Sequence, residues 1–280
     1  PIALYPSQDC LAGLGVLCSL SVFWIYGRDY RTVPNRTFGI AVQRVFTEHN
    51  RKDISKKKTS NPVFISKNII MITVTNLSKT YGGTLVLELP ELSIPKGQRF
   101  GLVGNNGAGK TTFFSLLLDL IESSSGRIAI NDIDVQSSED WKPFTAAFID
   151  ESYLIGYLTV EEYYYFLGSL RGLSTKEIDE WVLGFESFFN GEILGKKKYL
   201  RDLSKGNQKK AGIVGSLIGS PDLVILDEPF ANLDPSSQIG LKKLIEDIAK
   251  KSTITFLISS HDLTHVTEVC DRIVLLEKGK

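Results

Sequence analysis

The sequence contains few of the residues that build disulfide frameworks or zinc sites. Its three cysteines, Cys10, Cys18 and Cys270, are odd in number and widely spaced, which favours a reducing compartment. It lacks a series of long apolar runs, which excludes a polytopic membrane protein. It also lacks an excess of either charge, with 32 Lys and Arg against 32 Asp and Glu. A dedicated nucleic-acid binder usually carries a basic excess, so no nucleic-acid partner is expected. A hydrophobic content of 42% is that of an ordinary globular protein.

The balanced total conceals a change of sign along the chain. Residues 1–70 hold ten Lys and Arg and four Asp and Glu, whereas residues 71–280 hold 22 and 28. We therefore expect a boundary near residue 70, with a basic N-terminal segment before a larger domain over 71–280.

The first seventy residues admit three interpretations. Segment 11–26 contains no charge and is slightly short for a membrane span, and the basic residues after it would leave the following chain in the cytoplasm. Alternatively, the only methionine, Met71, is the natural start, and residues 1–70 are an upstream extension. The third interpretation is a disordered basic arm.

From Met71 onward, apolar runs of strand length alternate with helical patterns, which predicts an α/β fold. We expect strands over residues 100–104, 127–131, 144–149, 223–226, 255–259 and 272–277, and helices over 110–122 and 236–251. A helix-rich insertion lies between the third and fourth of these strands. Two of its helices are expected to begin at capping boxes, in which Thr159 pairs with Glu162 and Ser174 pairs with Glu177.

A glycine-rich segment follows the first of these strands. It reads GNNGAGKTT, which matches the phosphate-binding pattern G-x-x-x-x-G-K-[ST] between a strand and a helix. The glycines let successive backbone N–H groups face one anion, and the helix directs its positive end at the phosphates. Lys110 would reach the β- and γ-phosphates of ATP, and the Thr111 hydroxyl would ligate Mg²⁺. The ATP-binding residues predicted here are Gly104, Asn105, Asn106, Gly107, Ala108, Gly109, Lys110, Thr111 and Thr112.

Two adjacent acids end the apolar strand over 223–226, in the segment LVILDEPF. At the end of a strand the chain is free to turn both side chains toward one site. Asp227 would hold Mg²⁺ through a water molecule. Glu228 would polarise the attacking water, because a general base must lie next to the nucleophile rather than on the metal. The sequence thus predicts hydrolysis of ATP with Mg²⁺.

Four further motifs complete a resemblance to the ATP-binding cassette (ABC) ATPases. Residues 203–208, LSKGNQ, look like the signature motif, which is usually LSGGQ, and residues 231–235, ANLDP, resemble the D-loop. His261 resembles the switch histidine of the family. Tyr81 resembles the aromatic residue that stacks on adenine.

This resemblance, which covers about residues 71–280, implies a P-loop NTPase core with a mostly parallel sheet. It implies an N-terminal antiparallel β subdomain and a helical subdomain inserted over about 151–215. It also implies that the signature of one cassette meets the ATP bound by another, so that two copies sandwich two ATP molecules head to tail, isologous if the chain pairs with itself. The signature residues are Leu203, Ser204, Lys205, Gly206, Asn207 and Gln208, of which Lys205 and Asn207 depart from the commonest form.

The resemblance also assigns individual roles. Glu228 and His261 would be the catalytic residues, with His261 contacting the γ-phosphate. Leu233 and Asp234 lie in the D-loop, where Asp234 would couple the two sites.

One position departs from the family. A glutamine, the Q-loop residue, usually follows the strand that enters the helical subdomain, whereas this chain reads AAFIDES there. Either Asp150 or Glu151 occupies the position. The acid would approach Mg²⁺ more strongly than an amide and add negative charge beside the γ-phosphate, or it is a solvated loop acid that leaves hydrolysis to other groups. The acid and the LSKGNQ form resemble export-type cassettes.

Four consecutive aromatic residues, Tyr163, Tyr164, Tyr165 and Phe166, are too many for one helix face, so at least one is expected to be exposed or in an interface. In ABC transporters this subdomain receives a helix of the membrane permease. The resemblance therefore implies an ATPase subunit at the cytoplasmic face of the membrane, peripheral through a separate permease. ATP would close the dimer, and hydrolysis would open it.

Soluble relatives of other classes remain as alternatives. Translation-factor cassettes carry two cassettes in one chain, and DNA-repair cassettes place a long coiled coil between the phosphate loop and the signature. A non-hydrolysing adaptor module would be expected to have lost the acid at Glu228. Co-purification with a membrane protein, rather than with ribosomes or DNA, would separate these classes.

Overall fold

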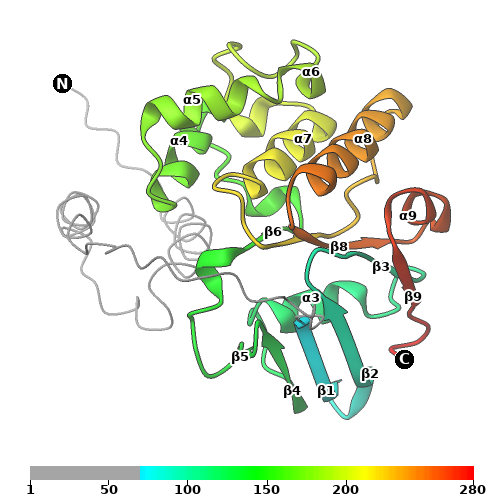
Figure 1. Ribbon diagram of the computed structural model, residues 1–280. Helices are drawn as coiled ribbons and strands as arrows, with labels where there is room; N and C mark the ends of the chain where they lie inside the picture. Colours follow the sequence, from blue (N-terminus) through cyan, green and yellow to red (C-terminus); the bar gives the residue numbers. More distant parts are fainter. Residues whose placement is uncertain (1–69) are drawn as a thin grey trace, which may run out of the picture. The chain divides into compact units, whose positions relative to one another are not determined.

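The computed structural model describes residues 70–280 (Figure 1). The expectations for the N-terminal segment, including its apolar stretch 11–26, lie outside these residues. The strands are β1 (Ile70–Tyr81), β2 (Thr84–Pro95), β3 (Arg99–Val103), β4 (Ser125–Ile130), β5 (Ile133–Asp134), β6 (Thr145–Phe148), β7 (Leu223–Leu226), β8 (Thr255–Ser260) and β9 (Arg272–Leu275). The α-helices are α3 (Lys110–Leu117), α4 (Val160–Leu170), α5 (Thr175–Leu183), α6 (Glu186–Phe189), α7 (Lys205–Ser216), α8 (Pro235–Lys251) and α9 (Leu263–Val269). Short 3-10 helices are η2 (Lys142–Phe144), η3 (Glu151–Tyr153) and η4 (Leu200–Asp202).

Four strands form an antiparallel sheet in the order β2-β1-β4-β5. β1 and β2 make a long hairpin whose turn is formed by Gly82 and Gly83, both in the positive-φ region that glycine adopts without strain. Ile72 and Val74 on β1 are fully buried, as expected for the inner face of a two-sided sheet. This sheet is the antiparallel β subdomain that the resemblance to the ABC ATPases implies.

Five strands form a parallel sheet in the order β6-β7-β8-β3-β9. β7 and β8 are buried along their whole length, which is typical of parallel strands that are covered on both faces. α8 connects β7 to β8 and completes the predicted strand–helix–strand unit. All six predicted strands are confirmed, each within two residues at either end.

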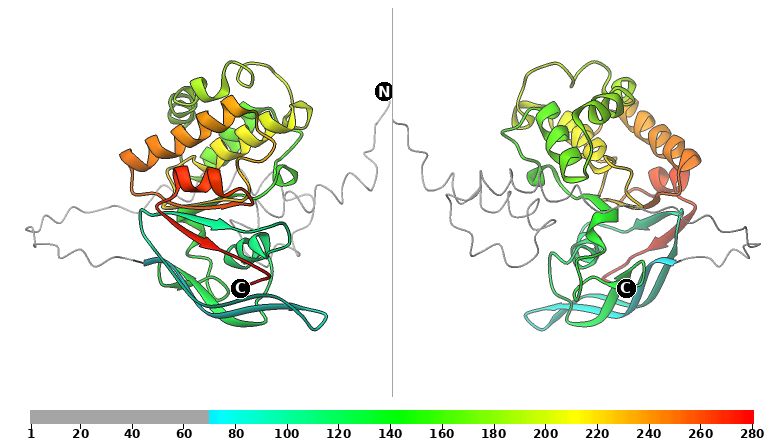
Figure 2. Two further views of the ribbon diagram at one scale, coloured as in Figure 1. Left: turned by 90° about the vertical axis from the view of Figure 1, so that its right-hand side faces the viewer. Right: turned by 60° about the vertical axis from the view of Figure 1, so that its left-hand side comes forward.

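Helices cover one face of the parallel sheet, and the antiparallel sheet lies beyond its other face (Figures 1 and 2). α7, α8 and α9 lie on the first face, and α3 lies on the second, between the two sheets. α4, α5 and α6 lie farther out and form the helical subdomain. One apolar core runs from β6, β7 and β8 into this subdomain, and its large buried side chains include Tyr164, Phe189 and Phe230.

Two glycines bring α7 close to its neighbours. A Cβ on Gly212 would lie 2.3 Å from the ring of Phe148 on β6, and a Cβ on Gly215 would lie 2.8 Å from the ring of Tyr163 on α4. Both distances are shorter than a carbon–carbon contact allows, so a side chain at either position would push the elements apart. α7 therefore packs tightly between the parallel sheet and the helical subdomain.

Of the helix boundaries predicted from the sequence, two starts are confirmed and one end is wrong. Both capping boxes are confirmed, with Thr159 and Ser174 each bonded to the glutamate three residues later. The helix predicted over 110–122 is wrong at its end, because α3 stops at Leu117 and Asp119 adopts a left-handed φ of 51°. An apolar composition continues past that point, but the backbone turns there.

The row of aromatic side chains is divided between core and surface. Tyr163 and Tyr164 are buried, whereas Tyr165 is 37% exposed and its hydroxyl donates to Asp179 at 2.6 Å. The expectation that at least one of the four is exposed is confirmed. Within residues 70–280, no helix combines the length and the apolar character needed to cross a bilayer.

Candidate functional site

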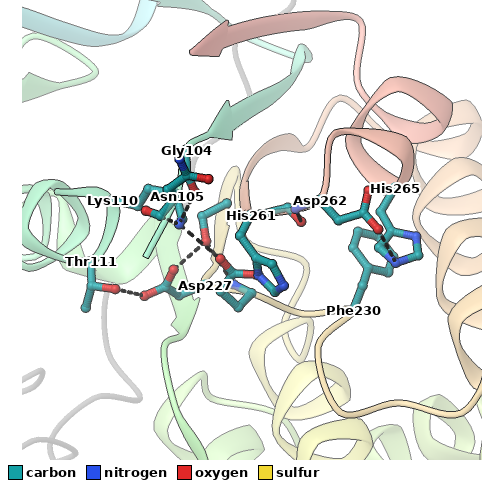
Figure 3. Close-up of polar contacts among 12 residues, drawn as sticks. Gly104, Asn105, Lys110, Thr111, Asp227, Phe230, His261, Asp262 and His265 are labelled. Atoms are coloured by element: carbon teal, nitrogen blue, oxygen red, sulfur yellow. Dashed lines mark hydrogen bonds and ion pairs between the residues drawn. The ribbon is translucent and has the colours of Figure 1, made fainter. Parts of the chain in front are cut away.

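Four of the five parallel strands lead into segments that the sequence singles out. The phosphate loop follows β3, Asp227 and Glu228 follow β7, His261 follows β8, and the Q-loop position follows β6. Since parallel strands share one carboxyl edge, these segments meet at that edge, where open α/β sheets bind their ligands. Figure 3 shows the side chains of the first three segments directed at one another.

One side of the phosphate loop packs against the residues after β9, and its other side is exposed to solvent. A Cβ on Gly104 would lie 2.4 Å from the carbonyl oxygen of Leu276, so the backbone leaves room only for glycine. Gly107 and Gly109 have φ of 82° and 104°, values that favour glycine. Asn106 and Gly107 are exposed, which leaves the tip of the loop accessible to an anion at the start of α3.

The Lys110 ammonium lies between the phosphate loop and Glu228. The side chain is 6% exposed, and Nζ donates to the carbonyl oxygens of Gly104 at 2.6 Å and Asn105 at 3.3 Å. Nζ also lies 3.1 Å from Oε1 of Glu228. The positive charge is therefore held where the terminal phosphates of a nucleotide on this loop would need it.

Asp227 lies between two hydroxyl donors. Thr111 Oγ1 donates to Oδ2 of Asp227 at 2.7 Å, and Ser259 donates to the other carboxylate oxygen. Burial raises the pKa of Asp227, although the two hydroxyl bonds act in the opposite direction. Hydroxyl and carboxylate oxygens are ligands that Mg²⁺ prefers, with water and phosphate oxygens in its remaining positions. Thr111 and Asp227 therefore fit a Mg²⁺ site that a bound nucleotide would complete.

Glu228 has an unusual backbone conformation. Its φ is 46°, a left-handed value that costs a residue other than glycine on the order of 1 kcal/mol. Its N–H donates to Ser259 Oγ at 2.8 Å, and its Oε2 lies 2.8 Å from Nδ1 of His261. The carboxylate thus reaches both Lys110 and His261. The neighbouring Asp227 faces Thr111 (Figure 3).

A cleft of about 300 Å³ lies beside Glu228 and His261. It extends to Phe230 and Asn232 in the segment before α8. The His265 ring also lines the cleft, and its centre lies 5.1 Å from that of the Phe230 ring. The cleft leads from the catalytic candidates toward the D-loop.

The signature segment presents an exposed helix end. Ser204 is the N-cap of α7, and its Oγ accepts the N–H of Asn207 at 3.2 Å. Ser204 and Lys205 are exposed. On its other side the segment adjoins the D-loop, since a Cβ on Gly206 would lie 3.6 Å from the carbonyl oxygen of Asn232. The positive end of this helix therefore faces outward.

Gln208 behaves differently from the rest of the signature. It is 8% exposed, and its side-chain amide donates to the carbonyl oxygens of Leu203 at 2.9 Å and Arg201 at 3.2 Å. The side chain braces the turn that precedes α7 and points into the protein.

The D-loop residues have local structural partners. Leu233 is 7% exposed and belongs to the apolar core. Asp234 is the N-cap of α8 and accepts the Ser236 hydroxyl at 2.6 Å, the Ser237 N–H at 3.0 Å and the Ser237 hydroxyl. These bonds, led by that from Ser236, hold the pKa of Asp234 well below its usual range. The carboxylate is therefore ionised and fixes the start of α8.

The adenine candidate Tyr81 lies at the end of β1 and is 50% exposed. The Lys79 ammonium lies 4.7 Å from the centre of its ring. A half-exposed ring offers a face on which a base can stack.

The two acids at the Q-loop position differ in surroundings. Asp150 is exposed, and its Oδ1 accepts the Ser152 N–H at 2.8 Å. Partial burial acts to raise the pKa of Asp150, but the bonds from Ser152 and the charges of Lys205 and Lys209 together lower it. The Glu151 side chain is only 12% exposed and lies 3.5 Å from Nζ of Lys209. The solvated-acid interpretation thus describes Asp150, whereas Glu151 is the acid that points inward.

Sequence reasoning missed two residues of this site. Ser259 bonds both Asp227 and the backbone of Glu228, and its signal was its position at the end of a strand beside β7. Lys209 donates to the carbonyl oxygen of Glu228 at 2.9 Å. The sequence shows only a lysine in the helix after the signature, and the burial of that lysine becomes visible only in the fold.

Comparisons with known proteins agree with this architecture. A sequence model described as ABC transporter matches residues 87–231. The uncharacterised ABC transporter ATP-binding protein YhaQ of Bacillus subtilis is 35% identical over 224 residues, covering 75% of this chain and 69% of YhaQ. The tungstate uptake system ATP-binding protein TupC of Peptoclostridium acidaminophilum is 33% identical over 211 residues, covering 75% of this chain and 96% of TupC.

Solved structures resemble the described fold. An ATP-binding subunit of an ABC transporter is 30% identical with a TM-score of 0.67, over 75% of this chain and 87% of that one. CbiO1 of Clostridium perfringens, described as part of the transporter complex cbiONQ, is 27% identical with a TM-score of 0.63, over 75% and 86%. The cassette MJ0796, a dimer bound to ADP and phosphate, matches in fold with a TM-score of 0.67 at 22% identity, over 75% and 95%.

A parallel sheet that carries a phosphate loop, a buried metal-type aspartate and an adjacent glutamate at one edge defines a P-loop ATPase. Among P-loop ATPases, the added antiparallel sheet and helical subdomain are the features shared with the ABC proteins compared above. The chain belongs to the ABC transporter family, as an ATP-hydrolysing, ATP-binding subunit.

Proposed function

We propose that two copies of this cassette hydrolyse ATP at sites shared between them. One observation carries the proposal: the exposed end of α7 at Ser204 adjoins the chain's own D-loop, whereas Lys110, Asp227 and Glu228 gather at the phosphate loop. Each chain thus supplies one half of two different sites. A homodimer, isologous and head to tail, would join the halves.

Within each site the residues divide the work. The phosphate loop and Lys110 bind the β- and γ-phosphates, and Thr111 with Asp227 would hold Mg²⁺, which neutralises phosphate charge when bound. Oε2 of Glu228 accepts the proton of the attacking water. His261, 2.8 Å from that oxygen, holds the carboxylate in place. Ser204 of the second copy directs the positive end of α7 at the γ-phosphate.

The roles of Glu228 and Lys110 are tested together. Glu228→Gln removes the proton acceptor and keeps the shape, so ATP should bind and a closed dimer should accumulate, with turnover reduced by about 100-fold or more. Lys110→Ala should lose ATP binding, because the loop then lacks its positive charge. Nucleotide binding, size-exclusion chromatography with light scattering and phosphate release measure these outcomes. Turnover at the wild-type rate in Glu228→Gln would remove Glu228 as the base.

We further propose that a separate membrane permease is the partner, which places the cassette at the cytoplasmic face of the membrane. The exposed Tyr165 on the helical subdomain supports this proposal, as does the description of CbiO1 as part of a transporter complex. Detergent extraction and affinity purification of the tagged chain should recover an integral membrane protein. Recovery of ribosomes or DNA alone would support a soluble class instead.

For direction we propose export, which rests on the acidic Q-loop and the LSKGNQ signature. The complex of cassette and permease is reconstituted into lipid vesicles with the cassettes on the outside, so that the outside corresponds to the cytoplasm. An exporter should then accumulate its transported compound in the lumen when ATP and Mg²⁺ are added outside. ATP-driven loss of compounds loaded into the lumen would instead establish uptake, the role stated in the name of TupC.

A further inference from the structure

An ion pair that the proposed roles leave unused connects the Q-loop position to α7. Lys209 Nζ lies 3.5 Å from Oε1 of Glu151, and the two side chains are 6% and 12% exposed. Oε1 of Glu151 accepts no hydrogen bond from any residue within 70–280. Lys209 is therefore the ion-pair partner of this buried carboxylate, and a buried charge whose partner is removed is strongly unfavourable.

The same ammonium holds the backbone of the proposed base. Lys209 Nζ donates to the carbonyl oxygen of Glu228 at 2.9 Å. The N–H of Glu228 is bonded to Ser259, so both backbone polar atoms of this residue have side-chain partners. Since a left-handed φ is unfavourable for glutamate, these two bonds help to maintain the conformation that turns its carboxylate toward Lys110.

The three residues come from three different parts of the fold. Glu151 begins η3, directly after β6 and at the entry to the helical subdomain. Lys209 lies on α7, five positions after Ser204 at the signature end of the helix. Glu228 follows β7. A displacement of the helical subdomain or of the signature helix would therefore reach the base through Lys209.

We propose that Glu151 and Lys209 are a pair of positioning residues that sets the backbone of Glu228 and links its orientation to the Q-loop segment and the signature helix. The inference rests on the proposed role of Glu228 as base. It assigns Glu151 a role different from metal binding, because its carboxylate is turned to Lys209. In this arrangement Glu151 fixes the lysine, and the lysine fixes the glutamate.

The neighbouring lysine provides a matched comparison. Lys210 is equally buried on the same helix, and its Nζ lies 3.8 Å from Oε2 of Glu192, an acid that is half exposed. Within residues 70–280, Lys210 forms no ion pair with Glu228. Glu192→Gln therefore removes an acid that faces a lysine of α7 without disturbing the backbone of the base.

The test is a double-mutant cycle on the full chain with ATP and Mg²⁺. Glu151→Gln and Lys209→Gln should each lower kcat by about tenfold and leave the KM for ATP within about twofold, because the base is misplaced while the nucleotide still binds. Because Glu151 acts on the base through Lys209, the two losses should not add. The double variant should turn over ATP within about twofold of the Lys209→Gln variant. Lys209→Arg, which keeps the charge and the donors, should stay near the wild type, as should Glu192→Gln.

Several outcomes would overturn the proposal. One is a double variant that loses the product of the two single losses. Another is an equal loss in Glu192→Gln, and a third is a changed Mg²⁺ requirement in Glu151→Gln, which would mean direct contact with the metal. Binding of a fluorescent ATP analogue identifies any variant that fails to fold, and Lys209→Arg with the double variant then carry the test. Failure of the proposed function would give a different result. If Glu228 is not the base, Glu228→Gln would turn over ATP normally, whereas the coupling between residues 151 and 209 would still appear in the melting temperatures of their variants.

Discussion

At the scale of single residues, Gly104 shows how little freedom the phosphate loop has. Its backbone lies so close to Leu276 that an added Cβ would meet the carbonyl oxygen at 2.4 Å. The last residues of the chain reinforce this contact, since the N–H of Gly279 donates to the carbonyl oxygen of Ala108 at 3.0 Å. Strand β9 and the residues after it therefore support the loop from behind.

Gly104→Ala should weaken ATP binding by about tenfold or more, a loss of 1.4 kcal/mol, because the loop must move to admit the methyl group. Titration with a fluorescent ATP analogue measures the loss. Gly240→Ala is the control, since Gly240, like Gly104, has no positive φ, but an added Cβ there comes no closer than 3.4 Å, to the Phe188 ring. Equal affinities for Gly104→Ala and the wild type would contradict the account of the loop.

Some residues of the site could be predicted from the sequence, and others could not. The glycines, Lys110 and Thr111 of the loop follow a fixed local pattern, so their arrangement could be predicted from the sequence. Ser259 and Lys209 bond to Glu228 from 31 and 19 positions away along the chain. No local pattern encodes such contacts, because they depend on which strands and helices become neighbours.

At the scale of elements, the helices of the insertion begin where their capping residues are. Thr159 accepts the N–H of Glu162, and the Glu162 carboxylate accepts the N–H of Thr159 in return. Thr159→Ala should reduce the free energy of unfolding by about 1 kcal/mol, because it leaves an N–H of the first turn without its partner. Urea unfolding measures the change, with Ser187→Ala as an exposed control on α6. A loss in the control as large as that in Thr159→Ala would show that capping is not its cause.

A second element-scale contact joins the starts of β3 and β9. Asp271 accepts the N–H and Nε of Arg99 at 3.0 and 3.2 Å, and it also pairs with the end of the guanidinium. The hydrogen bond from the Arg99 side chain, above all, lowers the pKa of Asp271. A lowered pKa means that the pair stabilises the fold above the usual aspartate pKa and loses this effect as the pH falls through the folded value.

Asp271→Asn should therefore cost at most about 1 kcal/mol at pH 7, since both groups are partly exposed and screened by solvent. The difference from the wild type should be the same at pH 5 and should shrink below about pH 4. Urea unfolding at the three pH values checks this. A difference that grows as the pH falls would contradict the direction of the pKa shift.

Element boundaries were predictable where a chemical signal marks them. Thr159 and Ser174 mark helix starts in the sequence, and the structure begins helices there. No such signal marks the end of α3, because Leu118 and Leu120 continue the apolar composition past the turn at Asp119. Likewise, the close contact of Gly212 with Phe148 depends on β6 lying against α7, which no local pattern shows.

At the scale of the whole molecule, the order of motifs along the chain predicted the fold class, because each motif occurs at a fixed place on the P-loop core. The sheet order β6-β7-β8-β3-β9 brings motifs that are up to 157 positions apart, Gly104 and His261, to one edge. The signature is the motif that stays outside this group. Its exposed helix end is the reason to expect a second copy.

The most direct measurement of that expectation mixes two inactive variants. Lys110→Ala disables the phosphate loop of its chain, and Ser204→Glu places a negative charge at the signature of its chain, so each variant alone should hydrolyse little ATP. In a mixed dimer, the intact loop of one copy meets the intact signature of the other. An equal mixture should therefore regain up to about a quarter of the wild-type rate, because half of the dimers are mixed and each has one complete site. A mixture no more active than its separate components would contradict the shared site.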